Sequence, residues 1–196
     1  MPFFKKSSPV SHIVVFLGNP GREYDETRHN VGFQVADVFA ERFGAKINRL
    51  KFSSLTAMAD VSGQRVFLMK PQTYMNLSGG AAWQAMAFYK VPLQNVIAVA
   101  DDVSLPVGKL RIRRSGSHGG HNGLKDISAK CGGDGFMRLK IGVGSPPHDD
   151  YIMADWVLSK FTGDDRLVID KAVVHAADAL ETIITQGIDK AMGEFN

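Results

Sequence analysis

The apolar and polar positions along the chain alternate between short buried strands and amphipathic helices. Short apolar or alternating runs predict strands over residues 12–18, 55–61, 65–69, 96–100, 109–113 and 137–143. Apolar residues at helical spacing predict helices over residues 30–43, 77–89, 123–131 and 164–186. This order predicts the α/β class, as a single domain with a mixed, twisted β-sheet and helices packed on both faces.

The first ten residues stand outside this pattern. Residues 1–10 contain two lysines but no apolar run after them, which does not fit a secretory signal. We expect them to form a flexible extension to one domain that spans residues 11–196. A chain of 196 residues is long enough for one well-buried core and short for two.

Composition narrows the class of protein. The chain is 44% hydrophobic and 22% charged, as is typical of soluble globular proteins. No apolar run approaches the about 20 residues that cross a bilayer, so we expect no membrane partner. Cys131 is the single cysteine, which excludes an internal disulfide and a cysteine-rich zinc site. We therefore expect a cytoplasmic protein.

The charges are distributed unevenly along the chain. The net charge is +3, yet residues 109–147 contain eight Lys or Arg and two Asp, a net charge of +6. Residues 149–196 contain four basic and ten acidic side chains, a net charge of −6. A basic face of this kind suits a polyanion such as nucleic acid, although a solvated basic strand would have the same composition.

Polar residues gather beside the predicted ends of strands. They lie in four stretches, residues 18–30, 71–79, 101–102 and 115–126. Ligands of open α/β sheets bind beyond the carboxyl ends of the strands, so these stretches are expected to meet. They supply histidines, asparagines and an aspartate, but no obvious nucleophile. This set suits activation of water, with His as general base, Asp as its orienting partner and Asn amides as oxyanion donors.

Each stretch also has a purely structural interpretation. Asn30 and Asn76 precede predicted helices and could be N-caps. Asn19, followed by Pro and Gly, suits a turn, and Asp101 could close another. The glycine-rich residues 116–123 could be a tight loop. The functional interpretation therefore rests on the convergence of all four stretches.

Several other chemistries lack their motifs. The chain contains no dinucleotide-binding G-x-G-x-x-G, no P-loop and no G-x-S-x-G elbow. His118 and His121, with Asp101 or His29, could in principle ligate a metal. However, H-x-x-H in a glycine loop lacks the i, i+4 spacing of a helical metal site. We therefore expect no metal and no cofactor.

Four blocks of sequence together resemble the bacterial peptidyl-tRNA hydrolases. They are Gly18–Gly21 with Tyr24 and Thr27–Gly32, then Thr73–Gly79, then Gly116–Asp126, then Arg138–Gly144. The resemblance runs from about residue 12 to residue 190. It implies a monomeric, metal-independent α/β hydrolase that cleaves the ester between peptide and tRNA. Such enzymes recycle tRNA from aborted translation.

The resemblance also implies roles for individual residues. The catalytic pair falls on His29, the base, and Asp101, its partner. The residues that hold the substrate or line its site fall on Asn19, Tyr24, Met75, Asn76, His121 and Asn122. The residues that bind the tRNA phosphate fall on Arg113 and Lys140. We expect His29 and Asp101 to lie within hydrogen-bonding reach, and both basic side chains to face solvent without acidic partners.

Residues Ala100–Pro106 depart from the pattern of the family. Ala100 and Ser104 replace a His and an Asp that are frequent there, which removes polar groups beside Asp101 and alters the expected hydrogen bonding. Two alternatives stay open: a non-catalytic RNA-binding homologue, or a hydrolase acting on another acyl ester or a nucleotide. A non-catalytic homologue would be expected to lose part of the catalytic set, which is complete here.

Overall fold

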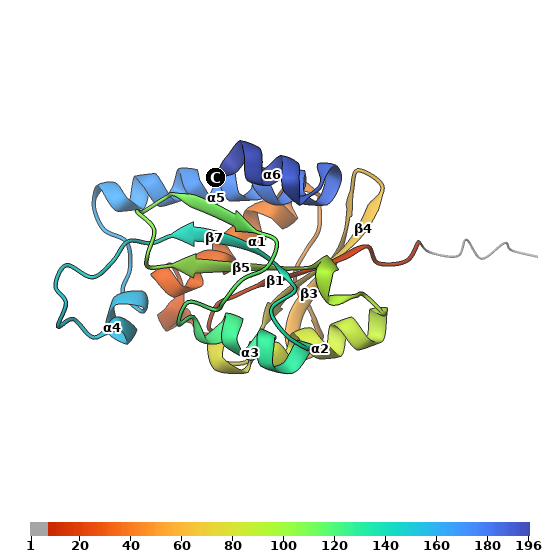
Figure 1. The fold of residues 1–196 in the computed structure, drawn as a ribbon, viewed down its shortest axis with the longest axis horizontal. Coiled ribbons are helices and arrows are strands. Elements are labelled where there is room, and N and C mark those ends of the chain that lie inside the picture. Colours follow the sequence, from red (N-terminus) through yellow and green to blue (C-terminus); the bar gives the residue numbers. More distant parts are fainter. Residues whose placement is uncertain (1–7) are drawn as a thin grey trace, which may run out of the picture.

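The computed structural model describes residues 8–196, in which a central seven-stranded sheet lies between two layers of helices (Figure 1). The strands are β1 (His12–Phe16), β2 (Arg49–Lys51), β3 (Ser54–Val61), β4 (Gln64–Pro71), β5 (Val96–Asp102), β6 (Leu110–Arg113) and β7 (Met137–Gly142). The α-helices are α1 (Val31–Arg42), α2 (Ser78–Tyr89), α3 (Asn122–Cys131), α4 (Met153–Val157), α5 (Asp164–Gln186) and α6 (Ile188–Phe195). Short 3₁₀ turns are η1 (Arg22–Tyr24), η2 (Arg28–Asn30), η3 (Met75–Leu77) and η4 (Leu93–Asn95). The predicted α/β class is confirmed.

The sheet is parallel in its centre and antiparallel at both edges. Its strand order is β2-β3-β4-β1-β5-β7-β6, with β1 pairing in parallel with both β4 and β5. Ile13–Phe16 of β1 are fully buried, because helices cover both faces of this central strand. The parallel strands β1 and β5 therefore end at the same edge of the sheet, where the predicted polar stretches begin.

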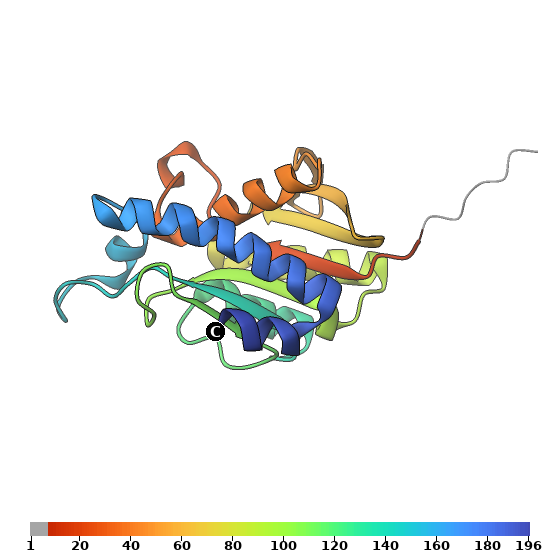
Figure 2. The same ribbon diagram turned by 90° about the horizontal axis from the view of Figure 1, so that it is seen from above.

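Two hydrophobic cores flank the sheet. On one face α1, α5 and α6 pack over the strands, and the long α5 crosses above them (Figures 1 and 2). On the other face α2 and α3 pack against each other and against β1 (Figure 1). In α1, Val31, Val35 and Phe39 recur at every fourth position and are fully buried, which explains why this segment forms an amphipathic helix.

Gly32 fixes the start of α1 against the sheet. A Cβ atom at this position would lie 2.4 Å from the carbonyl oxygen of Leu17 and 2.7 Å from that of Val99. Only glycine permits this approach. The turn η2, which immediately precedes α1, is consequently held next to the carboxyl ends of β1 and β5.

Three elements were not predicted. β2 is only three residues long, α4 lies in a segment that showed no periodic pattern, and α6 follows α5 after the left-handed Gly187. Residues 1–7 of the expected extension lie outside the described residues, whereas Val10 packs against the α2–α3 core. No helix within residues 8–196 is long and apolar enough to cross a membrane.

Candidate active site

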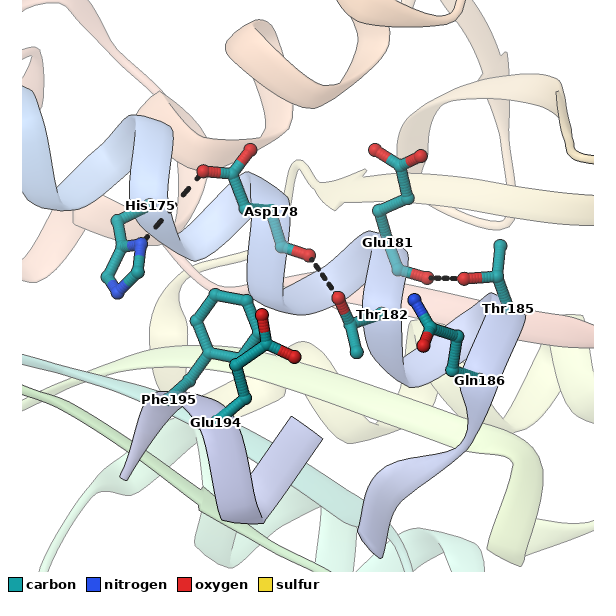
Figure 3. A pocket seen from close by; sticks show the side chains of 8 residues that line it. All are labelled: His175, Asp178, Glu181, Thr182, Thr185, Gln186, Glu194 and Phe195. Carbon is teal, nitrogen blue, oxygen red and sulfur yellow. Dashed lines mark hydrogen bonds and ion pairs between the residues drawn. The ribbon is translucent and has the colours of Figure 1, made fainter. Parts of the chain in front are cut away.

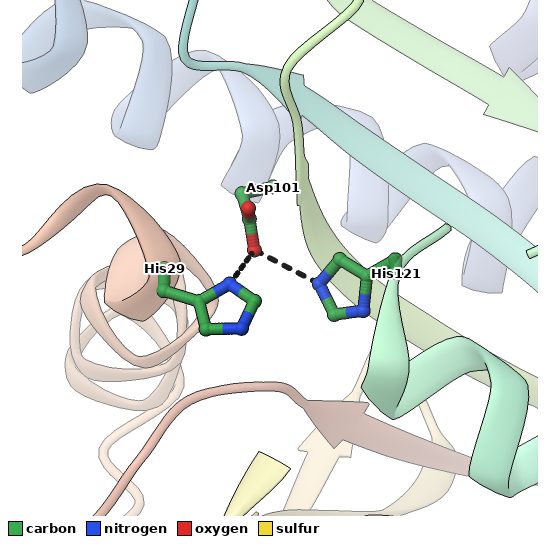
Figure 4. A group of neighbouring side chains, drawn as sticks. All are labelled: His29, Asp101 and His121. Atoms are coloured by element: carbon green, nitrogen blue, oxygen red, sulfur yellow. Dashed lines mark hydrogen bonds and ion pairs between the residues drawn. The ribbon is translucent and has the colours of Figure 1, made fainter. Parts of the chain in front are cut away.

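His29 and Asp101 meet at the carboxyl edge of the sheet. His29 lies in η2 and Asp101 lies near the end of β5, and the His29 Nδ1 atom is 2.8 Å from Asp101 Oδ1 (Figure 4). The Asp101 side chain is 3% exposed and the His29 side chain 12% exposed. The carboxylate is thus shielded from water, while the imidazole keeps an exposed part.

His121 binds the same carboxylate oxygen from the opposite side. It is the N-cap of α3, and its Nδ1 accepts hydrogen bonds from the backbone N–H groups of Gly123 and Leu124, at 3.1 and 3.4 Å. The proton of a neutral His121 is therefore on Nε2, which donates to Asp101 Oδ1 over 2.9 Å (Figure 4). Both ring nitrogens of His121 are occupied.

The environment of the pair favours a proton on His29. Burial opposes the charged imidazole, but the negative charge of Asp101 and its hydrogen bond outweigh burial and raise the pKa of His29. Burial also disfavours an ionised Asp101, yet its interactions with His29 and His121 lower the pKa of this carboxyl well below the usual range. Asp101 is therefore a carboxylate that accepts the Nδ1–H of His29, and this tautomer leaves the Nε2 of His29 free to accept a proton.

Asn19 and Asn30 form a buried network beside the pair. The Asn30 side chain accepts from the backbone N–H of Asn19 at 2.8 Å and donates to its carbonyl oxygen at 2.9 Å. Asn30 occupies the N-cap position of α1, as its place in the sequence suggested, but its side chain makes no capping hydrogen bond to the helix. The Asn19 Oδ1 accepts from the backbone N–H of Met75 at 2.8 Å. Within residues 8–196 the Nδ2 group of Asn19 has no partner, which leaves an N–H donor beside the site.

The other residues expected to bind substrate lie on neighbouring turns. Met75 is buried in η3, which packs against α3, and Asn76 in the same turn is exposed. The N-cap position of α2 is held by Leu77, so Asn76 is not the N-cap of that helix. Asn122 is the exposed first residue of α3, and Tyr24 is half-buried in η1.

Arg113 and Lys140 lie on neighbouring antiparallel strands, β6 and β7. Arg113 is opposite Arg138, and Lys140 is opposite Arg111, so all four side chains share one face of the sheet. Arg113 is exposed, and its guanidinium donates to the Ile112 carbonyl oxygen. Arg138, however, is buried and paired with Asp134, so its charge is not presented at the surface.

Lys140 is paired with an acid, contrary to the sequence-based expectation. Its Nζ lies 3.0 Å from Asp102 Oδ2, and the two side chains are 15% and 10% exposed. Ser104 donates to the other oxygen of Asp102 through its backbone N–H, at 2.8 Å, and its hydroxyl, at 2.6 Å. Although burial opposes ionisation, these bonds and Lys140 lower the pKa of Asp102. Ser104 thus supports Asp102 rather than Asp101.

The cluster also meets a geometric requirement for binding a metal ion. One donor atom each from His29, Asp101 and His121 lies within 4.8 Å of the others. However, His29 Nδ1 and His121 Nε2 lie 2.8 and 2.9 Å from Asp101 Oδ1, and these are the distances of hydrogen bonds, in which a proton lies between the two atoms. His118, the other candidate ligand, accepts the backbone N–H of Gly120 within its own loop. Hydrogen bonding therefore accounts for the cluster as it stands.

A groove of about 360 Å³ between α5 and α6 lies apart from this site (Figure 3). Its lining residues are His175, Asp178, Glu181, Thr182, Thr185, Gln186, Glu194 and Phe195. The two threonine hydroxyls donate to backbone carbonyls of α5 (Figure 3). Its three carboxylates make this groove unsuited to a nucleic-acid phosphate, and it includes none of the predicted site residues.

The structure thus combines an α/β domain with an imidazole held by a buried carboxylate, an arrangement suited to a hydrolase that activates water. Comparison with known proteins identifies the family. The peptidyl-tRNA hydrolase family profile matches residues 13–196. The peptidyl-tRNA hydrolase of Caldanaerobacter subterraneus subsp. tengcongensis is 49% identical over 94% of this chain and 99% of its own length. That of Thermoanaerobacter sp. strain X514 is 47% identical over the same shares. The crystal structure of peptidyl-tRNA hydrolase from Acinetobacter baumannii superposes with a TM-score of 0.89, at 33% identity and 97% coverage of both chains. The chain belongs to the peptidyl-tRNA hydrolase family.

Proposed function

We propose that this protein hydrolyses the ester between peptide and tRNA, with His29 as the general base and Asp101 as its orienting partner. The 2.8 Å hydrogen bond between His29 Nδ1 and Asp101 Oδ1 carries the proposal, since it leaves the Nε2 of His29 as a proton acceptor. Membership of the family supports the reaction, and the complete catalytic set does not favour a non-catalytic RNA-binding role.

The reaction follows from this arrangement. His29 Nε2 takes a proton from water as the water oxygen attacks the ester carbonyl. The resulting oxyanion collapses, the bond between the carbonyl carbon and the tRNA 3′-oxygen breaks, and the imidazolium returns the proton to that oxygen. General-base help of this kind gives about 10²–10⁴-fold acceleration, and preorganised donors at the oxyanion add to it. Asp101 stabilises the imidazolium that forms in between.

Amide groups around the base are suited to hold the substrate. The free Nδ2 of Asn19 can donate to a carbonyl oxygen, and Asn76 and Asn122 expose amides on neighbouring turns. Tyr24, Met75 and His121 complete the set that the resemblance implies. A site that reads the peptide backbone would disfavour the free, charged α-amine of an aminoacyl ester, because that amine would lose water without gaining a partner.

Arg113 and Lys140 are proposed to bind a phosphate of the tRNA. Lys140 would exchange Asp102 for the phosphate, and the basic side chains of β6 and β7 would add to the attraction. The monomeric state and the cytoplasmic location expected from the sequence belong to this proposal as well.

The proposal is tested with N-acetyl-aminoacyl-tRNA and free aminoacyl-tRNA as competing substrates, in the presence of EDTA. We expect rapid hydrolysis of the acetylated ester alone. His29→Ala should remove nearly all turnover and leave tRNA binding and thermal stability close to the wild type. The control is His175→Ala, because His175 is exposed on α5, and it should change none of these three properties. Wild-type turnover in His29→Ala would exclude His29 as the base, and tRNA binding without hydrolysis by the wild type would favour the RNA-binding alternative.

A further inference from the structure

Arg28, the residue directly before His29, is a buried cation. Its side chain is 4% exposed, and its guanidinium lies 3.8 Å from the centre of the Trp156 ring and 4.8 Å from that of Phe161. These aromatic residues lie at α4 and just before α5, far from Arg28 in sequence. The side chain therefore joins the turn that carries His29 to the segment between α4 and α5.

Hydrogen bonds fix the geometry of this contact between the turn and the segment between α4 and α5. The Arg28 Nη1 group donates to Ser159 Oγ at 2.7 Å and to the Lys160 carbonyl oxygen at 2.6 Å. The backbone N–H of Arg28 donates to the Ser159 carbonyl oxygen at 3.0 Å, and Thr27 forms a β-bridge with Lys160. The side chain and the backbone of the turn are thus fixed to the same short segment.

Folding stability alone does not explain why a charged guanidinium is buried at this position. Burial lowers the pKa of Arg28 despite the opposing effect of Asp165, whose carboxylate is 3.8 Å away and 44% exposed. The Nε group of Arg28 is buried without a hydrogen-bond partner in the described part of the chain. A buried ion pair is weak evidence for a role in stability, because the cost of desolvating the charges can exceed their Coulombic attraction. What arginine supplies is a planar fork that stacks and donates at the same time.

We propose that Arg28 is a positioning residue that sets the orientation of His29 toward Asp101. The inference rests on the proposed function, in which His29 is the base. Asn30 anchors the other side of the same residue through its two bonds to the Asn19 backbone. His29 is consequently held between two fixed neighbours, one tied to the α4–α5 segment and one to the end of β1.

The test uses Arg28→Lys, which keeps the charge, and Arg28→Met, which keeps the length of the side chain. The control is Arg42→Met, because Arg42 joins α1 to α5 through Asp178 and Glu181, at the end of α1 that is far from His29. We expect single-turnover hydrolysis to fall about 10- to 100-fold in both Arg28 variants, since a displacement of about 1 Å can cost this much. The KM of the Arg28 variants for peptidyl-tRNA should stay within about twofold of the wild type. Turnover by Arg42→Met should also stay within about twofold.

A second readout follows His29 itself. The charged and titratable groups that face it are Asp101 of β5 and His121 of α3, and neither is altered by the variants. An NMR titration of His29 in the Arg28 variants should show its pKa lowered from the wild-type value, as the bond to Asp101 loosens. Ser159→Ala removes one of the two acceptors of Arg28 Nη1, together with the bond from the Ser159 hydroxyl to the Trp156 carbonyl oxygen. It should cause a smaller change in the same direction and keeps the test available if an Arg28 variant fails to fold.

Two results would overturn the inference. One is an unchanged His29 titration with wild-type turnover in Arg28→Lys. The other is an equal loss of turnover in Arg42→Met at an equal loss of thermal stability, which would reduce Arg28 to a general structural role. Failure of the proposed function is detected separately, by turnover in His29→Ala, because the NMR titration reports the position of His29 whatever its chemical role.

Discussion

Replacing Asp101 by Asn isolates the effect of its charge. Asp101 Oδ1 accepts N–H groups from His29 and His121, at 2.8 and 2.9 Å, and an amide oxygen in the same place can accept both. The substitution then keeps both hydrogen bonds while it removes the negative charge and replaces the second oxygen by an NH₂ group. We expect a lower kcat, and an acidic limb of the pH–rate profile displaced to lower pH, because burial without the carboxylate lowers the pKa of His29.

The magnitude follows from the interaction that the imidazolium loses. A carboxylate and an imidazolium whose charges lie about 4 Å apart attract each other by about 4 kcal/mol at an effective dielectric constant of about 20. A charge-assisted hydrogen bond exceeds a neutral one by about 1 kcal/mol, which gives a lower limit for the change. A loss between these two limits, about 2–3 kcal/mol in the transition state, corresponds to a fall in kcat of about 30- to 150-fold.

The assay is single-turnover hydrolysis of N-acetyl-aminoacyl-tRNA by saturating enzyme from about pH 5 to about pH 9, a range that covers the ordinary pKa of histidine. The control is Asp60→Asn, because Asp60, near the end of β3, is a carboxylate that accepts the backbone N–H of Gly63 at 2.8 Å. It should keep the wild-type rate and profile. A wild-type profile in Asp101→Asn, or an acidic limb displaced to higher pH, would refute the electrostatic reasoning.

Three further predictions concern the charges of the site. The unfolding free energies of wild type and Asp101→Asn, measured by urea titration, should differ most between about pH 4 and about pH 6.5. Below this window, the stability that comes from the lowered pKa of Asp101 is lost as pH falls. Above it, the stability that comes from the raised pKa of His29 is lost as pH rises. A difference in unfolding free energy that stays constant with pH would contradict this coupling. Replacing Arg113 and Lys140 together by Ala should raise KM for full-length peptidyl-tRNA and flatten its salt dependence, but barely alter cleavage of a short 3′-fragment ester; equal effects on both substrates would reject phosphate binding. Asp102→Asn, which frees Lys140, should lower KM for the full-length substrate alone, and an unchanged KM would argue against exchange of Asp102 for phosphate.

The fold was predictable where one local pattern decides the structure. The buried strand β1 and the long amphipathic α5 are recognisable from their apolar residues alone, and α5 has the predicted bounds. β2 could not be predicted, because Arg49-Leu50-Lys51 is a short edge strand whose only apolar residue, Leu50, is 76% exposed. Its conformation depends on pairing with β3, a tertiary contact that local periodicity does not reveal.

The site was predictable in its location and less so in its contacts. Stretches at the ends of β1 and β5 were expected to meet, and the structure brings His29 and Asp101 together there. The pairing of Lys140 with Asp102 could not be foreseen, because the two residues come from different strands whose register is set by the whole sheet. Asn30 illustrates the same limit: its position before α1 suggests a cap, but its side chain binds the Asn19 backbone.

The structure also gives a physical reason for the different roles that the resemblance implies for the two histidines of the cluster. Their rings lie 5.0 Å apart and share one oxygen of Asp101. The Nδ1 of His121 is occupied by the backbone of α3, so His121 has no nitrogen left for water, whereas His29 directs one nitrogen to Asp101 and keeps the other. Because a general base needs a vacant lone pair as well as a suitable pKa, only His29 can serve in this arrangement. His121 instead ties Asp101 to the start of α3, and thereby holds the carboxylate to which His29 is hydrogen-bonded.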